Sequence, residues 1–392
     1  MLARESYTAR LMGRRRITML LLPVLAVLVT GLAVEGALRL AGAYVPLGYY
    51  LPQPGALRDT QSDYDVTYHV DGRGMREMPE RPPLPPGTAP VRVVLVGDSF
   101  TFGQGVEAAD AMPAQLESRL RAAGVPAEVI SLSAIGAGIA EYRVLLRDGA
   151  LPLHPALVVV NVFGNDASSA QASTGTQRLQ RAAAHASHVV TLLRTANRTR
   201  LLRENVRLSH DPAAFWARLE ETCARHSGRE TCAERVRRFR ALAGSRTNNL
   251  AAACLTDPDE VRRWVETDGG GAGWAEFREG VRDMHRRCAA AGIPLVLGVI
   301  PDAAQVDPGH LALLRDLGVS FRTDPLQGPG PFQTLVEGLG RELGIPVYSP
   351  LPAFRAAGPG TYFPEDLHWS PAGNRLYTDG LAPAVLAALG RP

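Results

Sequence analysis

The sequence predicts an α/β fold in which helices cover both faces of a parallel, doubly wound β-sheet. Two observations support this prediction. Short apolar runs alternate along the chain with segments whose apolar residues recur at helical spacing, an alternation that is typical of consecutive βαβ units. The first of these runs, 91–96, is apolar except for Arg92, as expected for a strand that is buried on both faces.

The predicted elements follow one another from residue 91 to the C-terminus. Strands are expected at 91–96, 127–135, 156–163, 293–300 and 345–349. Helices are expected at 112–123, 139–147, 274–291, 332–343 and 376–389. Ligands of open sheets bind at the carboxyl ends of the strands, so the residues that follow each strand are the first candidates for function.

One long segment, 167–273, interrupts the alternation after the third strand. It is rich in arginine, and short amphipathic helices are expected within it at 177–206 and 212–243. Because it follows the carboxyl end of a strand, this α-helical insertion would lie over the active site as a lid or subdomain. A solvated insertion with no role in substrate binding is the alternative.

The N-terminal residues predict a transmembrane anchor. A basic tail, 1–16, precedes the anchor segment, 17–40, whose first part, 17–34, is uncharged and apolar. That run would span roughly 27 Å as a helix, close to the thickness of a bilayer core. The positive-inside rule places the tail in the cytoplasm and the rest of the chain outside, on a bacterial inner membrane that the chain crosses once. Cleavage as a signal peptide at 41–43 is the alternative.

Residues 41–90 are rich in Pro, Gly and Tyr and are expected to form a spacer between the anchor and the α/β domain, 91–392. The proline run at 81–87 favours extended polyproline II structure. This division predicts a folded domain that is carried away from the membrane surface.

The composition excludes several kinds of chemistry. The chain of 392 residues contains no lysine, which excludes Schiff-base chemistry, a P-loop lysine and a lysine general base. The formal net charge is only +3, so no overall basic field indicates a nucleic-acid partner. A nucleotide site at Gly136-Ala137-Gly138 is disfavoured because the third glycine of the dinucleotide fingerprint is missing.

The cysteines fit an oxidising exterior. Cys223 and Cys232 are close enough in sequence to close a short loop, with Cys254 and Cys288 as a second pair, although three connectivities are open. Cys223, His226 and Cys232 are disfavoured as metal ligands, because their spacing matches no zinc pattern and no fourth ligand is evident. No metal or organic cofactor is expected.

The segment Gly97-Asp98-Ser99 directly follows the first predicted strand. A serine at a strand-to-helix turn exposes its hydroxyl at the edge of the sheet, where the N-terminus of the next helix offers a positive dipole to a developing oxyanion. Alone, the tripeptide is weak evidence, because Asp or Ser at such a turn often only caps the helix.

Two further motifs favour a catalytic role for Ser99. Gly164-Asn165-Asp166 ends the third strand and brings an amide donor to the same edge of the sheet. Near the C-terminus, Asp366-Leu367-His368-Trp369 places a histidine beside a carboxylate just before the last helix. Such a pair supplies a general base and the acid that orients it.

These separated blocks resemble the SGNH, or GDSL-like, hydrolase superfamily, in which Ser, Gly, Asn and His lie in four blocks. The likeness covers about residues 91–166 and 274–389. It implies a flavodoxin-like doubly wound sheet, with Ser99 as the nucleophile and His368 as the base.

The same resemblance implies an oxyanion hole and an acid for the triad. The oxyanion donors would be the backbone N–H groups of Ser99 and Gly136 and the side chain of Asn165. The acid lies three residues before the histidine in many members, a position that Glu365 holds here. Asp366 is preferred, since it completes the Asp-x-His-Trp pattern of alginate O-acetyltransferase-like and membrane-anchored bacterial members.

Two positions depart from the family pattern. Phe100 replaces the leucine of the GDSL name, with little consequence for the chemistry. Ser131 stands where many relatives have asparagine before the glycine of the second block, which makes that block the weakest.

The expected function is that of a membrane-anchored extracytoplasmic serine esterase, which cleaves an acyl ester of a lipid or polysaccharide through an acyl-enzyme. An O-acyltransferase that modifies an envelope polysaccharide is the alternative, because the sequence does not report whether water or a sugar hydroxyl takes the acyl group. A noncatalytic envelope-binding protein on an SGNH fold is the alternative from another class.

Overall fold

A computed structural model describes residues 22–23, 25–40, 55–80, 82–168, 211–227, 229–242, 248–267 and 269–391, with a few residues between 179 and 193. Its centre is a five-stranded sheet in the order β4-β3-β5-β6-β7, in which every neighbouring pair is parallel. The strands are β3 (Val91–Gly97), β4 (Ala127–Ser133), β5 (Leu157–Val162), β6 (Leu295–Val299) and β7 (Val347–Tyr348). Numbered among themselves, they follow the 2-1-3-4-5 order of flavodoxin-like sheets. The predicted α/β fold with a parallel sheet is therefore confirmed.

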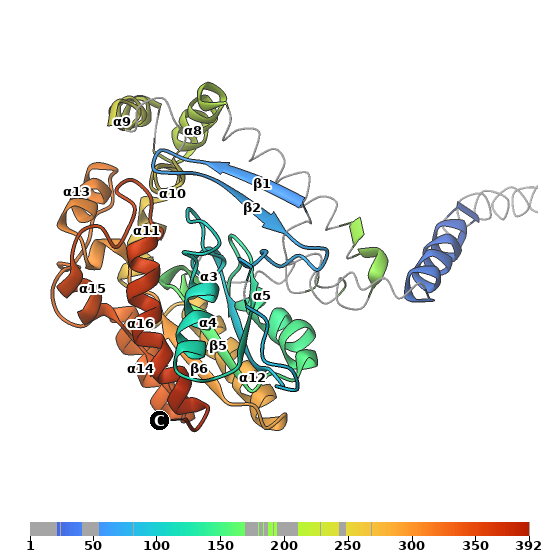
Figure 1. The fold of residues 1–392 in the computed structure, drawn as a ribbon. Coiled ribbons are helices and arrows are strands. Elements are labelled where there is room, and N and C mark those ends of the chain that lie inside the picture. Colours follow the sequence, from blue (N-terminus) through green and yellow to red (C-terminus); the bar gives the residue numbers. More distant parts are fainter. Residues whose placement is uncertain are drawn as a thin grey trace, which may run out of the picture.

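Helices cover both faces of this sheet (Figure 1). Side chains of β3 alternate between two cores: Val94 and Val96 lie in one, and Val93 and Leu95 in the other. The first core is covered by α5 (Ile139–Val144), α12 (Ala272–Ala290) and α14 (Pro331–Leu343). The second is covered by α4 (Met112–Ala122), α15 (Leu351–Ala357) and α16 (Pro371–Ala388).

The last helix, α16, begins five residues before the predicted start at residue 376, at Pro371. The hydroxyl of Ser370 accepts hydrogen bonds from the N–H groups of Ala372, at 3.2 Å, and Gly373, at 3.3 Å. Proline is favoured at the first position of a helix because its missing N–H would have no partner there. Serine capping and proline together fix the start directly after the predicted catalytic histidine.

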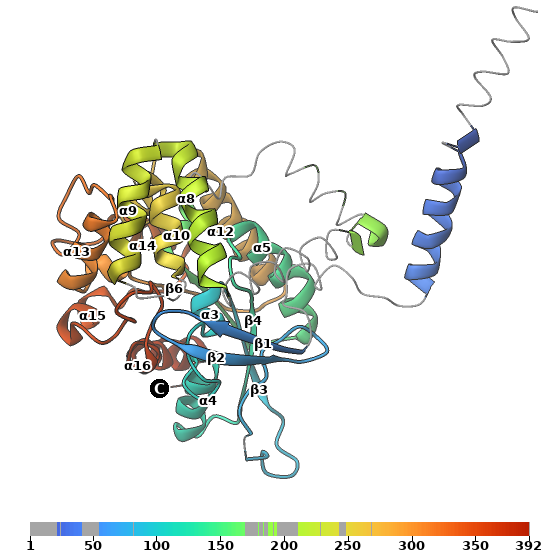
Figure 2. The same ribbon diagram turned by 90° about the horizontal axis from the view of Figure 1, so that it is seen from above.

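The predicted spacer contains a β-hairpin. β1 (Gly55–Thr60) pairs in antiparallel fashion with β2 (Asp65–Val70), and the hairpin lies beside the short helix α3 (Ser99–Phe102) (Figures 1 and 2). Every second residue of β2 is buried, and the ring of Tyr68 packs edge-on against that of Phe102, with 5.1 Å between centroids. The hairpin therefore differs from the expected spacer between anchor and domain, because the alternating apolar face of β2 packs against the domain.

Arg76 ties the end of the hairpin segment to the loop after α3. Its guanidinium is buried and donates hydrogen bonds to three backbone carbonyl oxygens, those of Phe102 at 2.9 Å, Gly103 at 2.6 Å and Val106 at 2.5 Å. The hairpin is therefore part of the folded domain at the edge of the sheet where the predicted nucleophile lies.

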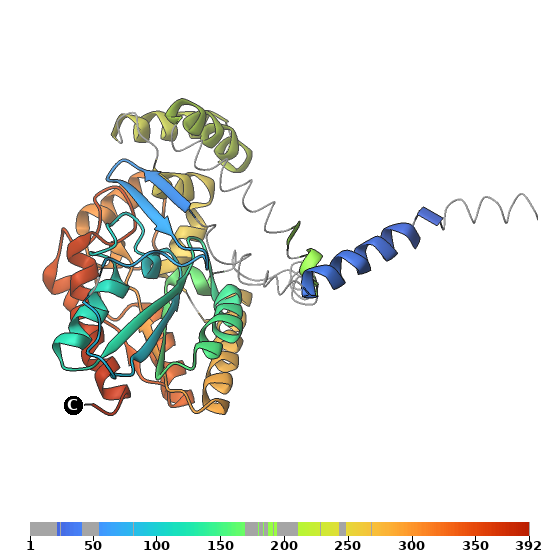
Figure 3. The ribbon, with the colours of Figure 1, turned by 45° about the vertical axis from the view of Figure 1, so that its right-hand side comes forward.

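The insertion contributes a helical layer of its own, made of α8 (Pro212–Ser227), α9 (Arg229–Leu242), α10 (Asn249–Thr256) and α11 (Pro258–Val265). Their apolar side chains form a third core together with α13 (Pro308–Asp316). Figure 3 shows this layer at the same end of the sheet as the hairpin. The helix that was expected at 177–206 falls almost entirely outside the described residues.

Of the cysteine pairings that the sequence left open, the structure contains one bond. A disulfide joins Cys223 of α8 to Cys232 of α9. Cys254 and Cys288 are both free and buried, so they do not form the second pair that the sequence allowed. They belong to different cores, since Cys254 packs among the insertion helices and Cys288 packs against the sheet.

Within the described residues, no helix has both the length and the apolar character needed to cross a bilayer. The predicted cytoplasmic tail, 1–16, and the start of the predicted anchor lie outside the described residues.

Candidate active site

Ser99 is the first residue of α3, and only Asp98 separates it from the end of β3. A Cβ on Gly97 would lie 2.1 Å from Oγ1 of Thr101, so only glycine fits at the end of the strand. The Asp98 carboxylate caps the helix by accepting a hydrogen bond from the N–H of Phe100 at 3.0 Å. Because Asp98 supplies the cap, the alternative in which Ser99 merely caps the helix does not describe this turn.

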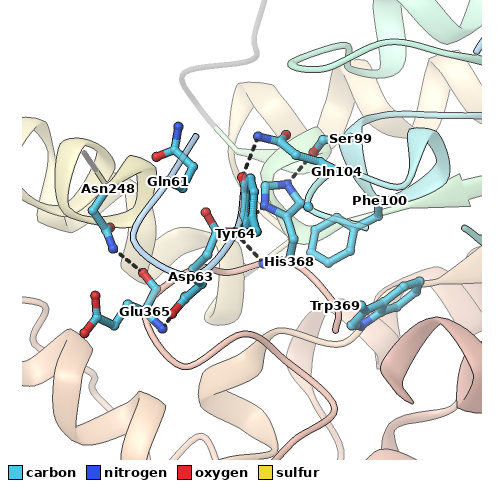
Figure 4. Close-up of polar contacts among 12 residues, drawn as sticks. Gln61, Asp63, Tyr64, Ser99, Phe100, Gln104, Asn248, Glu365, His368 and Trp369 are labelled. Atoms are coloured by element: carbon cyan, nitrogen blue, oxygen red, sulfur yellow. Dashed lines mark hydrogen bonds and ion pairs between the residues drawn. The ribbon is translucent and has the colours of Figure 1, made fainter. Parts of the chain in front are cut away.

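His368 lies between Ser99 and Asp366. Its Nε2 is 2.7 Å from Oγ of Ser99, and its Nδ1 is 2.5 Å from Oδ1 of Asp366. The same carboxylate oxygen accepts a hydrogen bond from the backbone N–H of His368 at 2.9 Å. In Figure 4 the side chain of Glu365 points away from the His368 ring. The structure thus brings together Ser99, His368 and Asp366, in the order nucleophile, base and acid that a catalytic triad requires.

Burial and charge have opposite effects on the pKa values of Asp366 and His368. Burial by itself would raise the pKa of Asp366, but the His368 ring beside it outweighs burial and lowers that pKa below its ordinary value. Burial likewise opposes protonation of His368, yet the adjacent Asp366 carboxylate raises the pKa of the imidazole. Asp366 therefore remains ionised and stabilises a positive charge on His368, which a base acquires when it takes a proton.

The predicted oxyanion donors follow the two strands that flank β3. Gly136 lies in the loop after β4 with φ of +73°, a left-handed conformation that glycine adopts at little cost. Asn165 lies in the single helical turn Gly164–Ala167 after β5. Its backbone carbonyl accepts a hydrogen bond from the hydroxyl of Ser168 at 2.8 Å, which holds the turn. Since β4 and β5 both neighbour β3 in parallel, their carboxyl ends meet at the edge that carries Ser99.

A group of polar side chains that the sequence did not predict joins the hairpin to Gln104 in the loop after α3. Gln104 donates from Nε2 to Asp59 Oδ2 and to the hydroxyl of Tyr64, each at 3.2 Å. Tyr64 lies beside the His368 ring in Figure 4 and is buried. The alternation of apolar residues in β2 was the available signal for this hairpin, but the surrounding proline and glycine residues obscured it.

The described residues contain no group of three His, Cys, Asp or Glu side chains that could hold a metal ion. The sulfur atoms of Cys223 and Cys232 are bonded to each other, so neither is a thiolate that could ligate zinc.

Residues 95–376 match the model of the GDSL-like Lipase/Acylhydrolase family. This match spans well over half of the chain. The chain belongs to this family. The resemblance found in the sequence is thereby confirmed, and this GDSL-like protein is an enzyme that acts on ester bonds.

Solved structures of GDSL-like hydrolases match this chain at low identity. TesA is 13% identical, with a TM-score of 0.39, over 76% of this chain and 99% of its own. An acetyl xylan esterase, AlAXEase, is 13% identical, with a TM-score of 0.38, over 75% of this chain and 100% of its own. A lipase/acylhydrolase from Enterococcus faecalis is 13% identical, with a TM-score of 0.37, over 76% of this chain and 95% of its own. No curated protein sequence matches the chain significantly.

Proposed function

We propose that this GDSL-like enzyme is a serine esterase in which Ser99, His368 and Asp366 form the catalytic triad. The observation that supports the proposal most directly is the continuous hydrogen-bonded line from Ser99 Oγ through the His368 ring to Asp366 Oδ1. A serine within hydrogen-bond distance of a histidine, which is in turn oriented by a buried carboxylate, is the arrangement that activates a hydroxyl as a nucleophile.

The reaction proceeds in two steps. Ser99 Oγ attacks the ester carbonyl carbon while His368 Nε2 takes the hydroxyl proton, and the same proton then passes to the departing alkoxide. Water next gives a proton to the now neutral His368 and attacks the acyl carbon. The bond from that carbon to Ser99 Oγ then breaks, the acid leaves, and His368 returns the proton to Ser99 Oγ. In both tetrahedral intermediates the oxyanion accepts hydrogen bonds from Asn165 and from the backbone N–H groups of Ser99 and Gly136.

The test is ester hydrolysis by the purified protein and its Ser99→Ala variant. With p-nitrophenyl acetate as substrate, the variant is expected to lose about 10⁴-fold or more in kcat, because removing a triad nucleophile leaves only binding and oxyanion stabilisation. A fluorophosphonate probe is expected to label the wild-type protein at Ser99 and to leave the variant unlabelled. Full esterase activity in a folded Ser99→Ala variant would contradict the triad.

A second candidate is an O-acyltransferase that passes the acyl group to a polysaccharide hydroxyl. It is favoured by the burial of the triad, since Ser99 is 9% exposed and His368 5% exposed. A site that restricts water prolongs the acyl-enzyme and gives a bound sugar hydroxyl time to react. Acyl transfer to added glycan in excess of hydrolysis would support transferase function, whereas hydrolysis unaffected by glycan would support the esterase.

We also propose that residues 17–40 anchor the enzyme in a bacterial inner membrane, with the α/β domain outside the cytoplasm. The support is the arginine-rich tail followed by an uncharged apolar run. Cell fractionation tests the proposal: the full chain is expected in the membrane fraction, and removal of residues 1–40 is expected to release it. Recovery of the full chain in the soluble fraction would contradict anchoring.

A further inference from the structure

Two side chains outside the triad hold the backbone of the loop that carries it. The N–H of Glu365 donates a hydrogen bond to Oδ2 of Asp63 at 2.7 Å. The carbonyl oxygen of the same residue accepts a hydrogen bond from Nδ2 of Asn248 at 2.6 Å. Figure 4 shows both contacts converging on Glu365, on the side of the loop opposite the Ser99–His368 pair. Residue 365 is therefore fixed at both of its peptide groups, directly before Asp366.

The two side chains come from separate parts of the chain. Asp63 lies in the turn of the β1–β2 hairpin, and Asn248 is the N-cap of α10 in the insertion. The amide of Asn248 also donates to the hydroxyl of Ser62 at 2.9 Å, which joins the hairpin to the insertion. The hairpin, the insertion and the catalytic loop thus meet at one point.

Each of the two side chains carries the group that its contact with Glu365 requires: Asn248 has a donor and Asp63 an acceptor. Oδ1 of Asn248 caps α10 by accepting a hydrogen bond from the N–H of Ala251 at 2.8 Å. The NH₂ group of Asn248 therefore supplies the donor for the loop. Asp63 is charged when ionised, and hydrogen bonds from backbone N–H groups to a carboxylate are stronger than those to neutral acceptors. Burial raises the pKa of Asp63 to about 6, so the carboxylate is ionised at neutral pH and above.

We propose that Asp63 and Asn248 are positioning residues, which set the backbone of Glu365 and thereby hold Asp366 and His368 in line with Ser99. This inference rests on the proposed esterase mechanism, because it assigns these residues an effect on the triad. Asp366 follows Glu365 directly, so a rotation of the Glu365 peptide swings the carboxylate away from the imidazole. A displacement of about 1 Å in such a constellation costs on the order of 100-fold in rate.

The experiment compares variants that remove each contact with variants that keep it. Asp63→Ala removes the acceptor, and Asp63→Asn retains a neutral one. Asn248→Ser and Asn248→Asp both keep a capping oxygen for α10 and lose the amide donor. The control is Asp257→Ala, which removes the cap of the neighbouring helix α11; among the described residues, the Asp257 carboxylate bonds to Glu260 and Arg263 of α11 and not to the catalytic loop.

For each protein, kcat, KM and the pH dependence of kcat/KM are measured with p-nitrophenyl acetate. Asp63→Ala and both Asn248 variants are expected to lower kcat by about 10- to 100-fold with little change in KM. The acidic midpoint of the kcat/KM profile is expected to move to a lower pH, because a displaced Asp366 no longer raises the pKa of His368. Asp63→Asn is expected to recover most of the activity, and Asp257→Ala to keep the wild-type midpoint.

A second readout does not depend on activity. The pKa of His368 is measured by NMR from its imidazole carbon-bound protons, and it is expected to fall in Asp63→Ala and in Asn248→Ser. If the wild-type protein cleaves no ester while these shifts occur, the proposed function fails and the positioning role stands. An unchanged His368 pKa and an unchanged profile midpoint in folded variants would overturn the positioning role.

Discussion

The side-chain oxygen of Ser99 lies 2.7 Å from Nε2 of His368, a residue 269 positions further along the chain. The contact joins the end of β3 to the loop directly before α16, which packs with α4 in the same core. The side chains that the proposed mechanism assigns as nucleophile and base therefore lie within hydrogen-bond distance of each other. Such a prearranged pair needs no reorganisation to begin acyl transfer.

The activity of the enzyme is expected to fall as the pH is lowered through the pKa of His368. A base must be neutral to accept a proton, and Asp366 raises the pKa of His368 above the ordinary histidine value of about 6.5. The acidic midpoint of kcat/KM is therefore expected above pH 6.5, with full activity on the alkaline side. A midpoint at or below the ordinary histidine value, measured with a substrate that does not titrate, would contradict this.

The identity of the acid is tested by two matched variants. Asp366→Asn is expected to lower kcat by about 10⁴-fold, because the amide favours the wrong tautomer of His368. Glu365→Gln keeps the backbone contacts of the loop and changes a side chain that points away from His368, so kcat is expected to stay near the wild-type value. A large loss of kcat in Glu365→Gln together with a near wild-type kcat in Asp366→Asn would assign the acid to Glu365.

Loss of the amide of Asn165 is expected to slow the reaction without weakening substrate binding. Asn165→Ala removes a donor that the proposed mechanism assigns to the oxyanion alone, so kcat is expected to fall by about 10²- to 10³-fold while KM changes little. Asn165→Asp is the stricter comparison, because it preserves shape and replaces a donor by a negative charge; its kcat is expected to be lower still. A change confined to KM would instead indicate a role in ground-state binding.

The disulfide between Cys223 and Cys232 is expected to stabilise the insertion. The bond closes a loop with a sequence separation of 9 residues. By restricting the unfolded chain, it is expected to raise the free energy of unfolding by about 2–3 kcal/mol. Reduction with dithiothreitol is therefore expected to lower the denaturant midpoint of the insertion. The Cys223→Ser/Cys232→Ser variant is the control, and its midpoint is expected to be low and insensitive to the reductant. Equal midpoints for the oxidised and reduced wild-type protein would contradict the prediction.

Most of the sheet could be predicted because its strands are buried on both faces, which leaves a mainly apolar signature such as the four apolar residues Leu157 to Val160 of β5. The β1–β2 hairpin gave a weaker signal, since it is short, amphipathic and surrounded by proline and glycine. Its burial depends on Tyr68 meeting Phe102, residues in different elements. Contacts of that kind leave no periodic pattern in the sequence.

The sequence by itself determined the α/β fold, the family and the types of residue at the site: Ser99 and Asn165 after strands, and His368 with a neighbouring acid before the last helix. These follow from local rules, because burial on two faces dictates apolar strands and each motif is confined to a few consecutive residues. Only the tertiary structure decided that Asp366 rather than Glu365 contacts His368, that Cys254 and Cys288 lie in different cores, and that Asp63 and Asn248 hold the catalytic loop. Those outcomes depend on side-chain direction and on distances between segments far apart in the chain, which packing alone fixes.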